Sequence, residues 1–161
     1  MIERLPFTFD AARLAGDLAL CDQGIRHNTM GWTCLPLRSR GGSMHDPTSG
    51  VAGVLPWADT PLLVCCSYFR EVLAALETQY PMTSVRVSAL APGGEILFHR
   101  EADSPRRIHV PVVTSAAAGL QFEETVCHWG AGEAWLADFG VRHRAWNRGS
   151  TPRVHLLCLL R

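Results

Sequence analysis

The sequence has no excess of charge of either sign. Lys and Arg together number 15, and so do Asp and Glu, over 161 residues. A chain with this balance has no overall field that would draw it to nucleic acid or to an anionic membrane surface. We therefore expect neither a nucleic-acid nor a membrane partner.

Long apolar runs are also missing. No segment approaches the roughly 18 apolar residues that a membrane-spanning helix needs. The start, MIERLPFTFDAARLAGDLAL, shows no basic stretch followed by a long apolar one. The composition, 47% apolar and 19% charged, is ordinary for one globular domain with a single core. We expect a single domain over residues 1–161 that is soluble and cytoplasmic.

The chain has cysteines but lacks the patterns that would give them a shared role. No two of the six form a CxxC pair, and Cys65 and Cys66 are adjacent. Such spacing fits neither a disulfide framework nor a zinc knuckle. We expect reduced and mostly buried thiols.

Helical periodicity is confined to two segments of the first half. Residues 1–20 predict a short strand and then a helix capped by Asp10, with apolar residues at helical spacing. From Cys21 to Pro61 the many Gly, Pro, Ser and Asp residues predict loops with one or two strands. The stretch SYFREVLAALETQY predicts a helix, ended before Pro81, whose apolar stripe holds Phe69, Val72, Leu73 and Leu76.

After Pro81 the period changes to that of β-strands. Short segments rich in β-branched and aromatic residues are separated by Gly, Pro or Ser; they are VRVSAL, EILFHRE, RIHVPVV, LQFEETVCHW, EAWLADF and RVHLLCLL. Six such strands within about 80 residues predict an antiparallel sandwich or barrel. The chain shows no internal repeat and no low-complexity tract.

One segment, ILFHRE, places a histidine and a carboxylate two residues apart. In an extended strand His99 and Glu101 would share a face, as two ligands of one metal require. The pair alone is weak, because a solvated strand end explains it equally well. A third ligand strengthens it, since two histidines and one carboxylate leave three metal positions open. His143 is the candidate, and the alternative is a surface histidine between Arg142 and Arg144.

Arg153 begins the strand RVHLLCLL ten residues after His143. Alternation places it on one side with His155, Leu157 and Leu159. An arginine directed into an apolar interior needs an anion, and a dicarboxylate held by a metal at its other end would supply one. The alternative is a salt bridge at the rim.

Three stretches resemble a known family: RVSALAPGGEILFHRE, RRIHVPV and GEAWLADFGVRHRAWNRGSTPRVHLL. They are similar to the aspartyl/asparaginyl β-hydroxylase family, which includes bacterial proline hydroxylases. The resemblance runs from about Val85 to Leu157 and more loosely through GWTCLPLRSRGG. It implies a mainly β chain folded as a double-stranded β-helix, a jelly-roll or cupin-like fold with one or two flanking helices. It also implies an iron(II)- and 2-oxoglutarate-dependent dioxygenase that consumes O₂.

Carried over residue by residue, the resemblance assigns roles to the same side chains. It implies that His99 and His143 are iron ligands, and that Glu101 stands where many members have aspartate and some have a small residue. Arg153 would bind the distal carboxylate of 2-oxoglutarate. Further positions that match the family are Ser88, Arg107 and His109, which would contact the cosubstrate, and Asn147 in HRAWN.

The alternation of the strands agrees with these assignments. Arg107 and His109 fall on one face of RIHVPVV, and Ser88 shares a face with Arg86 and Leu90. Several polar groups would thus enter an apolar interior, which favours a ligand-filled site because unpartnered buried polar groups cost about 1–3 kcal/mol each. The alternative is that His109 and His155 are core histidines bonded to backbone, which we prefer for His155.

The function implied is hydroxylation of an amino acid or amino-acid residue, with Asp, Asn or Pro as leading candidates, coupled to decarboxylation of 2-oxoglutarate to succinate and CO₂. We expect a free or carrier-tethered amino acid rather than a protein domain. Trp32, Arg38 and Arg40 could contact it, although exposed arginines are usually only solvated. Two alternatives stay open, namely a non-catalytic β-barrel module that binds a small carboxylate and a non-oxidative cupin-like metalloenzyme.

Overall fold

The computed structural model describes residues 1–21, 31–44, 55–102 and 105–161. Three helices occur in these ranges: α1 (Ala11–Cys21), α2 (Pro61–Cys65) and α3 (Ser67–Glu77). The strands are β1 (Ile2–Thr8), β2 (Trp32–Arg40), β3 (Trp57–Asp59), β4 (Met82–Leu90), β5 (Glu95–His99), β6 (Arg106–Val113), β7 (Ala118–Phe122), β8 (Thr125–Cys127), β9 (Glu133–Asp138), β10 (His143–Asn147) and β11 (Arg153–Leu160).

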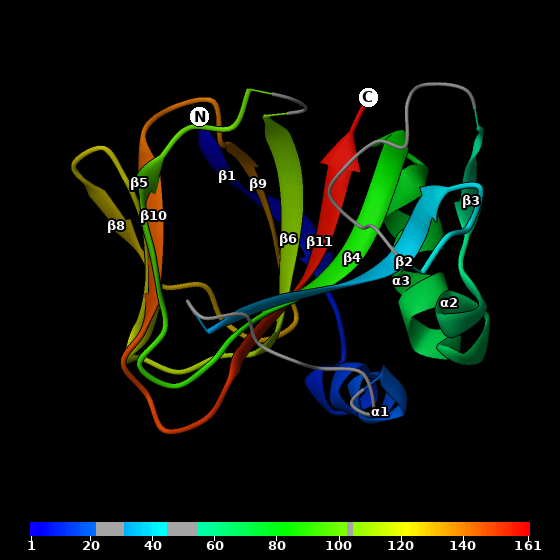
Figure 1. The fold of residues 1–161 in the computed structure, drawn as a ribbon, viewed down its shortest axis with the longest axis horizontal. Coiled ribbons are helices and arrows are strands. Elements are labelled where there is room, and N and C mark those ends of the chain that lie inside the picture. The colour runs from blue at the N-terminus through cyan, green and yellow to red at the C-terminus, as the bar shows by residue number, and fades with distance from the viewer. Residues whose placement is uncertain (22–30, 45–54, 103–104) are drawn as a thin grey trace.

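The strands form two antiparallel sheets that face each other. The larger has the order β1-β9-β6-β11-β4-β2-β3, and the smaller has the order β5-β10-β7-β8. Figure 1 shows the smaller sheet at the left and the larger sheet beside it. Crossing between sheets along the chain gives the double-stranded β-helix expected from the sequence. The fold is therefore mainly β, as predicted.

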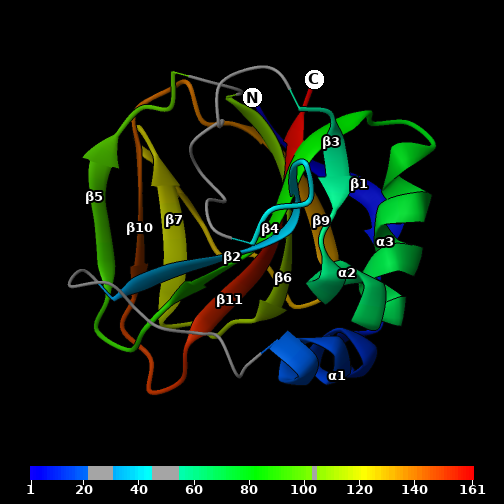
Figure 2. The ribbon, with the colours of Figure 1, turned by 45° about the vertical axis from the view of Figure 1, so that its right-hand side comes forward.

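All three helices pack on the outer face of the larger sheet, away from the smaller one (Figure 2). The stripe predicted for α3 is confirmed, because Phe69, Val72, Leu73 and Leu76 are buried in the main core cluster. Asp10 also caps α1 as predicted, since its Oδ1 accepts hydrogen bonds from the backbone N–H groups of Ala12 and Arg13. The main apolar core therefore lies between the helices and the larger sheet.

Period-two alternation divides the central strands of the larger sheet between two environments. On β4, β6 and β11 one set of side chains enters the core beneath the helices: Val85, Val87, Ile108, Val110, Val154, Leu156 and Cys158. The intervening residues face the smaller sheet. One face of these strands therefore packs in the apolar core beneath the helices, and the opposite face, toward the smaller sheet, can carry polar side chains.

Two segments differ from the sequence prediction. LQFEETVCHW is not one strand but the hairpin β7–β8, in which Phe122 pairs with Thr125 and Glu123 adopts a φ of 51°. Such turns usually contain Gly, Asn or Asp, and none is present here. No strand was predicted over HRAWN, but it forms β10, in the smaller sheet between β5 and β7.

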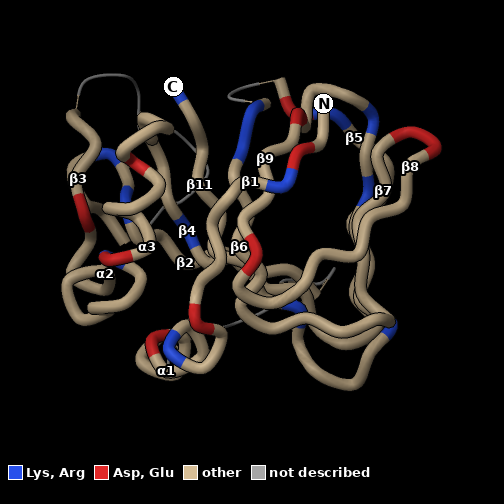
Figure 3. Tube along the Cα trace, turned by 180° about the vertical axis from the view of Figure 1, so that it is seen from behind, with Lys and Arg blue, Asp and Glu red and all other residues tan. Residues whose placement is uncertain are grey.

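Acidic and basic residues are interspersed along the described trace when the molecule is seen from behind (Figure 3). Within the described ranges, no helix combines the length and the apolar character needed to cross a membrane. All six cysteines are free thiols, and Cys21, Cys66 and Cys158 are buried.

Candidate metal centre and anion pocket

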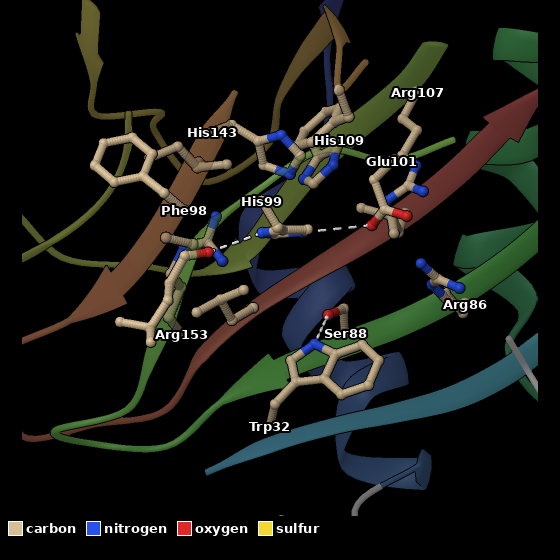
Figure 4. A pocket seen from close by; sticks show the side chains of 16 residues that line it. Trp32, Arg86, Ser88, Phe98, His99, Glu101, Arg107, His109, His143 and Arg153 are labelled. Atoms are coloured by element: carbon tan, nitrogen blue, oxygen red, sulfur yellow. Dashed lines mark hydrogen bonds and ion pairs between the residues drawn. The ribbon is translucent and has the colours of Figure 1, made fainter. Parts of the chain in front are cut away.

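A pocket of about 420 Å³ opens between the two sheets. It is lined by Trp32, Arg86, Ser88, Ile96, Leu97, Phe98, His99, Glu101, Arg107, His109, Leu120, Phe139, His143, Ala145, Arg153 and Leu157. The seven site residues expected from the sequence are all in this lining, and Figure 4 shows them converging from both sheets. Its size is within the usual range for small-molecule sites.

His99 and His143 meet across the smaller sheet. The two residues are register partners on β5 and β10, so their side chains project from the same face. Their ring centroids are 4.2 Å apart. The Nδ1 atom of His99 lies 2.8 Å from the Leu97 carbonyl, and that of His143 lies 2.9 Å from the Val141 carbonyl. Because Nδ1–H donates in both cases, each Nε2 presents a lone pair to the pocket.

Glu101 lies two residues beyond the end of β5 and is held by its backbone N–H, which donates to the Phe139 carbonyl at 2.9 Å. Its Oε1 is 3.6 Å from Nε2 of His99 and accepts a hydrogen bond from Nη1 of Arg107 at 2.9 Å. Burial alone would raise the pKa of Glu101, but the hydrogen bond and charge of Arg107 outweigh it and lower that pKa. Glu101 is therefore a carboxylate at neutral pH.

The residues His99, Glu101 and His143 could together hold a metal ion, since their ligand atoms all lie within 4.8 Å of one another. Burial lowers the pKa of His143, which keeps its imidazole neutral as a metal ligand must be. Two imidazole nitrogens and one carboxylate suit ferrous iron with open positions for other ligands. The side chains present therefore fit an iron centre of this type.

Arg153 is one of three buried arginines that line the pocket. Only 6% of its surface is exposed, and burial lowers its pKa to about 10. The guanidinium stays protonated at neutral pH, because that value is still well above 7. Its Nη2 lies 3.4 Å from Nδ1 of His155. A buried guanidinium beside a metal centre is suited to bind a carboxylate in a two-pronged contact.

His109 and His155 form a buried pair next to Arg153. Their Nδ1 atoms are 3.2 Å apart, and the ring of His109 stacks on Phe139 at 4.7 Å. Burial, together with the charge of Arg153, lowers the pKa of both histidines well below its ordinary value. His155 is a buried core histidine, as preferred from the sequence, but the expected backbone partner is wrong, because its contacts are to the side chains of His109 and Arg153.

Ser88 and Trp32 form another wall of the pocket. Trp32 Nε1 donates to Ser88 Oγ at 3.0 Å, which leaves the Ser88 hydroxyl proton able to donate to a ligand. Trp32 was suggested from the sequence as a substrate contact, and the structure places it in the lining. Arg107 enters from β6, and its guanidinium lies 5.3 Å from the centre of the Phe139 ring.

Three other residues singled out in the sequence lie outside the pocket lining. Arg38 forms ion pairs with Asp59 at 2.6 Å and with Glu77. Arg40 donates to the Leu55 carbonyl and lies over the ring of Trp57. Asn147 is buried and donates to the Leu90 and Thr151 carbonyls, so it fixes the turn after β10. All three have structural partners in the described chain.

One charged residue of the pocket lining, Arg86, was not assigned a role from the sequence. Arg86 lies on β4, two residues from Ser88 and on the same face, and only 6% of its surface is exposed. The signal was present, because a charged residue interrupts the apolar strand VRVSAL at a position that alternates inward with Ser88.

Comparison with known proteins places this geometry in context. The sequence model of the family described as aspartyl/asparaginyl beta-hydroxylase matches residues 17–161. A curated relative, L-proline cis-4-hydroxylase of Rhizobium meliloti (strain 1021), is 28% identical over 162 residues. That match covers 92% of this chain and 56% of the relative, so the chain spans little more than half the relative's length.

Solved structures support the fold. An oxidoreductase of the 2OG-Fe(II) oxygenase family from Burkholderia pseudomallei superposes with a TM-score of 0.67 and 14% identity, covering 99% of this chain and 83% of its own. A viral collagen prolyl hydroxylase from Paramecium bursaria Chlorella virus-1, in complex with 2OG, gives a TM-score of 0.58 at 12% identity, over 99% of this chain and 94% of its own.

Proposed function

We propose that this chain, which belongs to the aspartyl/asparaginyl β-hydroxylase family, uses ferrous iron, 2-oxoglutarate and O₂ to hydroxylate an amino acid or amino-acid residue. The observation that carries the proposal is the convergence of His99, Glu101 and His143 in a pocket that also holds the buried Arg153. A metal centre and an anion site then face the same enclosed space, as a metal-chelating dicarboxylate requires.

His99, Glu101 and His143 would hold the metal, and their own side chains are held in place by neighbouring groups. The Leu97 and Val141 carbonyls orient the two imidazoles, and Arg107 orients the Glu101 carboxylate. Bound iron would supply the redox chemistry that couples decarboxylation of 2-oxoglutarate to hydroxylation of a C–H bond. The protein contributes the positions of the reactants and the exclusion of water.

Arg153 binds the distal carboxylate of 2-oxoglutarate in this proposal. Its burial makes the interaction strong, because water cannot replace the carboxylate and the guanidinium stays charged. Ser88, Arg107 and His109 contribute further contacts to the cosubstrate from β4 and β6. These roles follow the family resemblance, and their support is that all four side chains line one pocket.

Aromatic and aliphatic side chains form the remaining wall of the pocket. Phe139 packs edge-to-face on His143, with ring centroids 4.8 Å apart, and Phe98 and Leu120 also line the site. Such walls exclude water from the metal and favour one orientation of a small substrate. The substrate would lie between this wall and the metal, with Asp, Asn or Pro as the leading side chains.

An anaerobic titration followed by turnover tests this function. The protein should bind one equivalent of Fe(II), bind 2-oxoglutarate only with the metal present, and form succinate when O₂ and one member of an amino-acid panel are added. Metal binding without consumption of 2-oxoglutarate would instead identify a non-oxidative cupin-like enzyme. Binding of carboxylates without metal would identify a non-catalytic module.

A further inference from the structure

We propose that Arg86 binds the carboxylate of the substrate, so that the substrate is a free amino acid rather than one joined through that carboxyl group to a carrier or a peptide. This inference rests on the proposed function and concerns its substrate class. Its basis is that Arg86 is a further buried cation in the pocket, placed away from Arg153, which would hold the distal carboxylate of the cosubstrate.

The backbone holds Arg86 in the pocket. Its neighbours Val85 and Val87 are buried in the core beneath the helices, so alternation directs the Arg86 side chain to the opposite face of β4. Turning the guanidinium out of the pocket would require both valines to leave that core. Burial lowers the pKa of Arg86, and a carboxylate ligand would favour its charged form.

The side chains of Arg86 and Arg153 lie in different regions of the pocket. In the pairing of β11 with β4, Arg153 lies opposite Leu90, which is four residues from Arg86. At about 3.3 Å per residue, this separation is roughly 13 Å along the strand. Figure 4 shows the two guanidinium groups on opposite sides of the His99–Glu101 pair. A cosubstrate anchored at Arg153 and chelated at the metal therefore leaves the Arg86 region for a second ligand.

The charge of the lining favours an anion as that second ligand. Its ionisable side chains include the three guanidinium groups of Arg86, Arg107 and Arg153, but Glu101 is the one carboxylate among the lining residues that the structure describes. Such an excess of enclosed positive charge attracts anions. A free amino acid supplies a carboxylate, whereas a thioester or amide of the same amino acid does not.

Paired ligands that differ only in this carboxylate test the inference. Calorimetry on the protein loaded with Mn(II) and 2-oxoglutarate, without O₂, would measure binding of the twenty common amino acids and then of the primary amide of the tightest. The wild type should prefer the acid by roughly 30-fold or more, as loss of one partner of a buried ion pair predicts. In Arg86→Gln that preference should fall to about threefold or less, with partial recovery in Arg86→Lys.

A crossed comparison separates this site from the cosubstrate site. Arg86→Gln should weaken amino-acid binding far more than 2-oxoglutarate binding, and Arg153→Gln should do the reverse. Arg148→Gln, which changes an exposed arginine outside the lining, serves as the matched control. If folded Arg86→Gln still prefers the amino acid over its amide as strongly as the wild type does, the inference is overturned. It is also overturned if the wild type binds the amide as tightly as the amino acid, or binds no free amino acid. Failure to consume 2-oxoglutarate counts against the proposed function instead.

Discussion

His99 and His143 are register partners on adjacent strands, with imidazole centroids 4.2 Å apart and both Nδ1 atoms bonded to the backbone two residues earlier. With each Nδ1 bonded to backbone, each Nε2 is the ring nitrogen left to bind a metal, and the ligand atoms of the site already lie within 4.8 Å of one another in the folded protein. Because the orientation is built into the sheet, the cost of ordering the ligands is already met in folding.

The first prediction concerns His143. His143→Ala should remove high-affinity Fe(II) binding and turnover but preserve the fold, since the side chain borders the pocket rather than the main core. Equilibrium dialysis with Fe(II) under argon and circular dichroism would measure the two effects. His128→Ala is the control for loss of an imidazole, because His128 is an exposed histidine outside the lining. Unchanged iron affinity in His143→Ala would remove the ligand assignment.

Replacement of Glu101 tests whether the site has two or three protein ligands. Glu101→Ala should lower Fe(II) affinity by at least about tenfold, because loss of a ligating group should cost no less than loss of a group that only orients one. Glu101→Gln separates the two roles of this side chain, since the amide oxygen can still accept from Arg107 but carries no charge. Wild-type iron affinity in both variants would mean a two-histidine centre.

Removal of Arg153 should act on the cosubstrate. Arg153→Ala should weaken 2-oxoglutarate binding by roughly 30-fold or more, the loss expected when one partner of a buried charge pair is truncated. Iron affinity measured without 2-oxoglutarate should change little, because Arg153 is not one of the three metal-ligand candidates. Anaerobic titrations of each ligand alone and together would provide both constants. A dependence on 2-oxoglutarate equal to that of the wild type contradicts the role.

Acid should destabilise the fold through the buried pair His109 and His155. Both have a pKa well below 6.5 when folded, so the unfolded chain takes up protons first as the pH falls below 6.5. Stability is therefore present above this pH and decreases below it, by up to about 1.4 kcal/mol per pH unit for each histidine. Urea unfolding between pH 7.5 and about 5 would measure the slope. In His155→Asn the change of unfolding free energy with pH should be smaller, by the contribution of one histidine. An unchanged slope would show that other groups cause the pH dependence.

The alternation of the strands made much of the site predictable. VRVSAL, RIHVPVV and RVHLLCLL each interleave apolar residues with polar ones, and this predicted that Ser88, Arg107, His109 and Arg153 would share one interior. The structure places all four in one lining. Two facing sheets explain why, since the apolar set needs the helices and the polar set is left to face the smaller sheet.

The parts that were missed depend on contacts that a sequence pattern does not record. β10 is short and carries polar residues, and its strand conformation is set by pairing with β5 on one side and β7 on the other. The β7–β8 turn uses Glu123 at a φ of 51°, where the usual turn residues are absent. The partners of His155 lie on its own strand and on β6, so only the assembled sheet brings them together.

The most direct test of the central claim is a crystal structure of the protein grown without oxygen in the presence of Fe(II) and 2-oxoglutarate, with iron located by anomalous scattering. We expect one iron bound by the Nε2 atoms of His99 and His143 and by Glu101, with the far carboxylate of 2-oxoglutarate on Arg153. An iron site elsewhere, or 2-oxoglutarate bound away from Arg153, would contradict it.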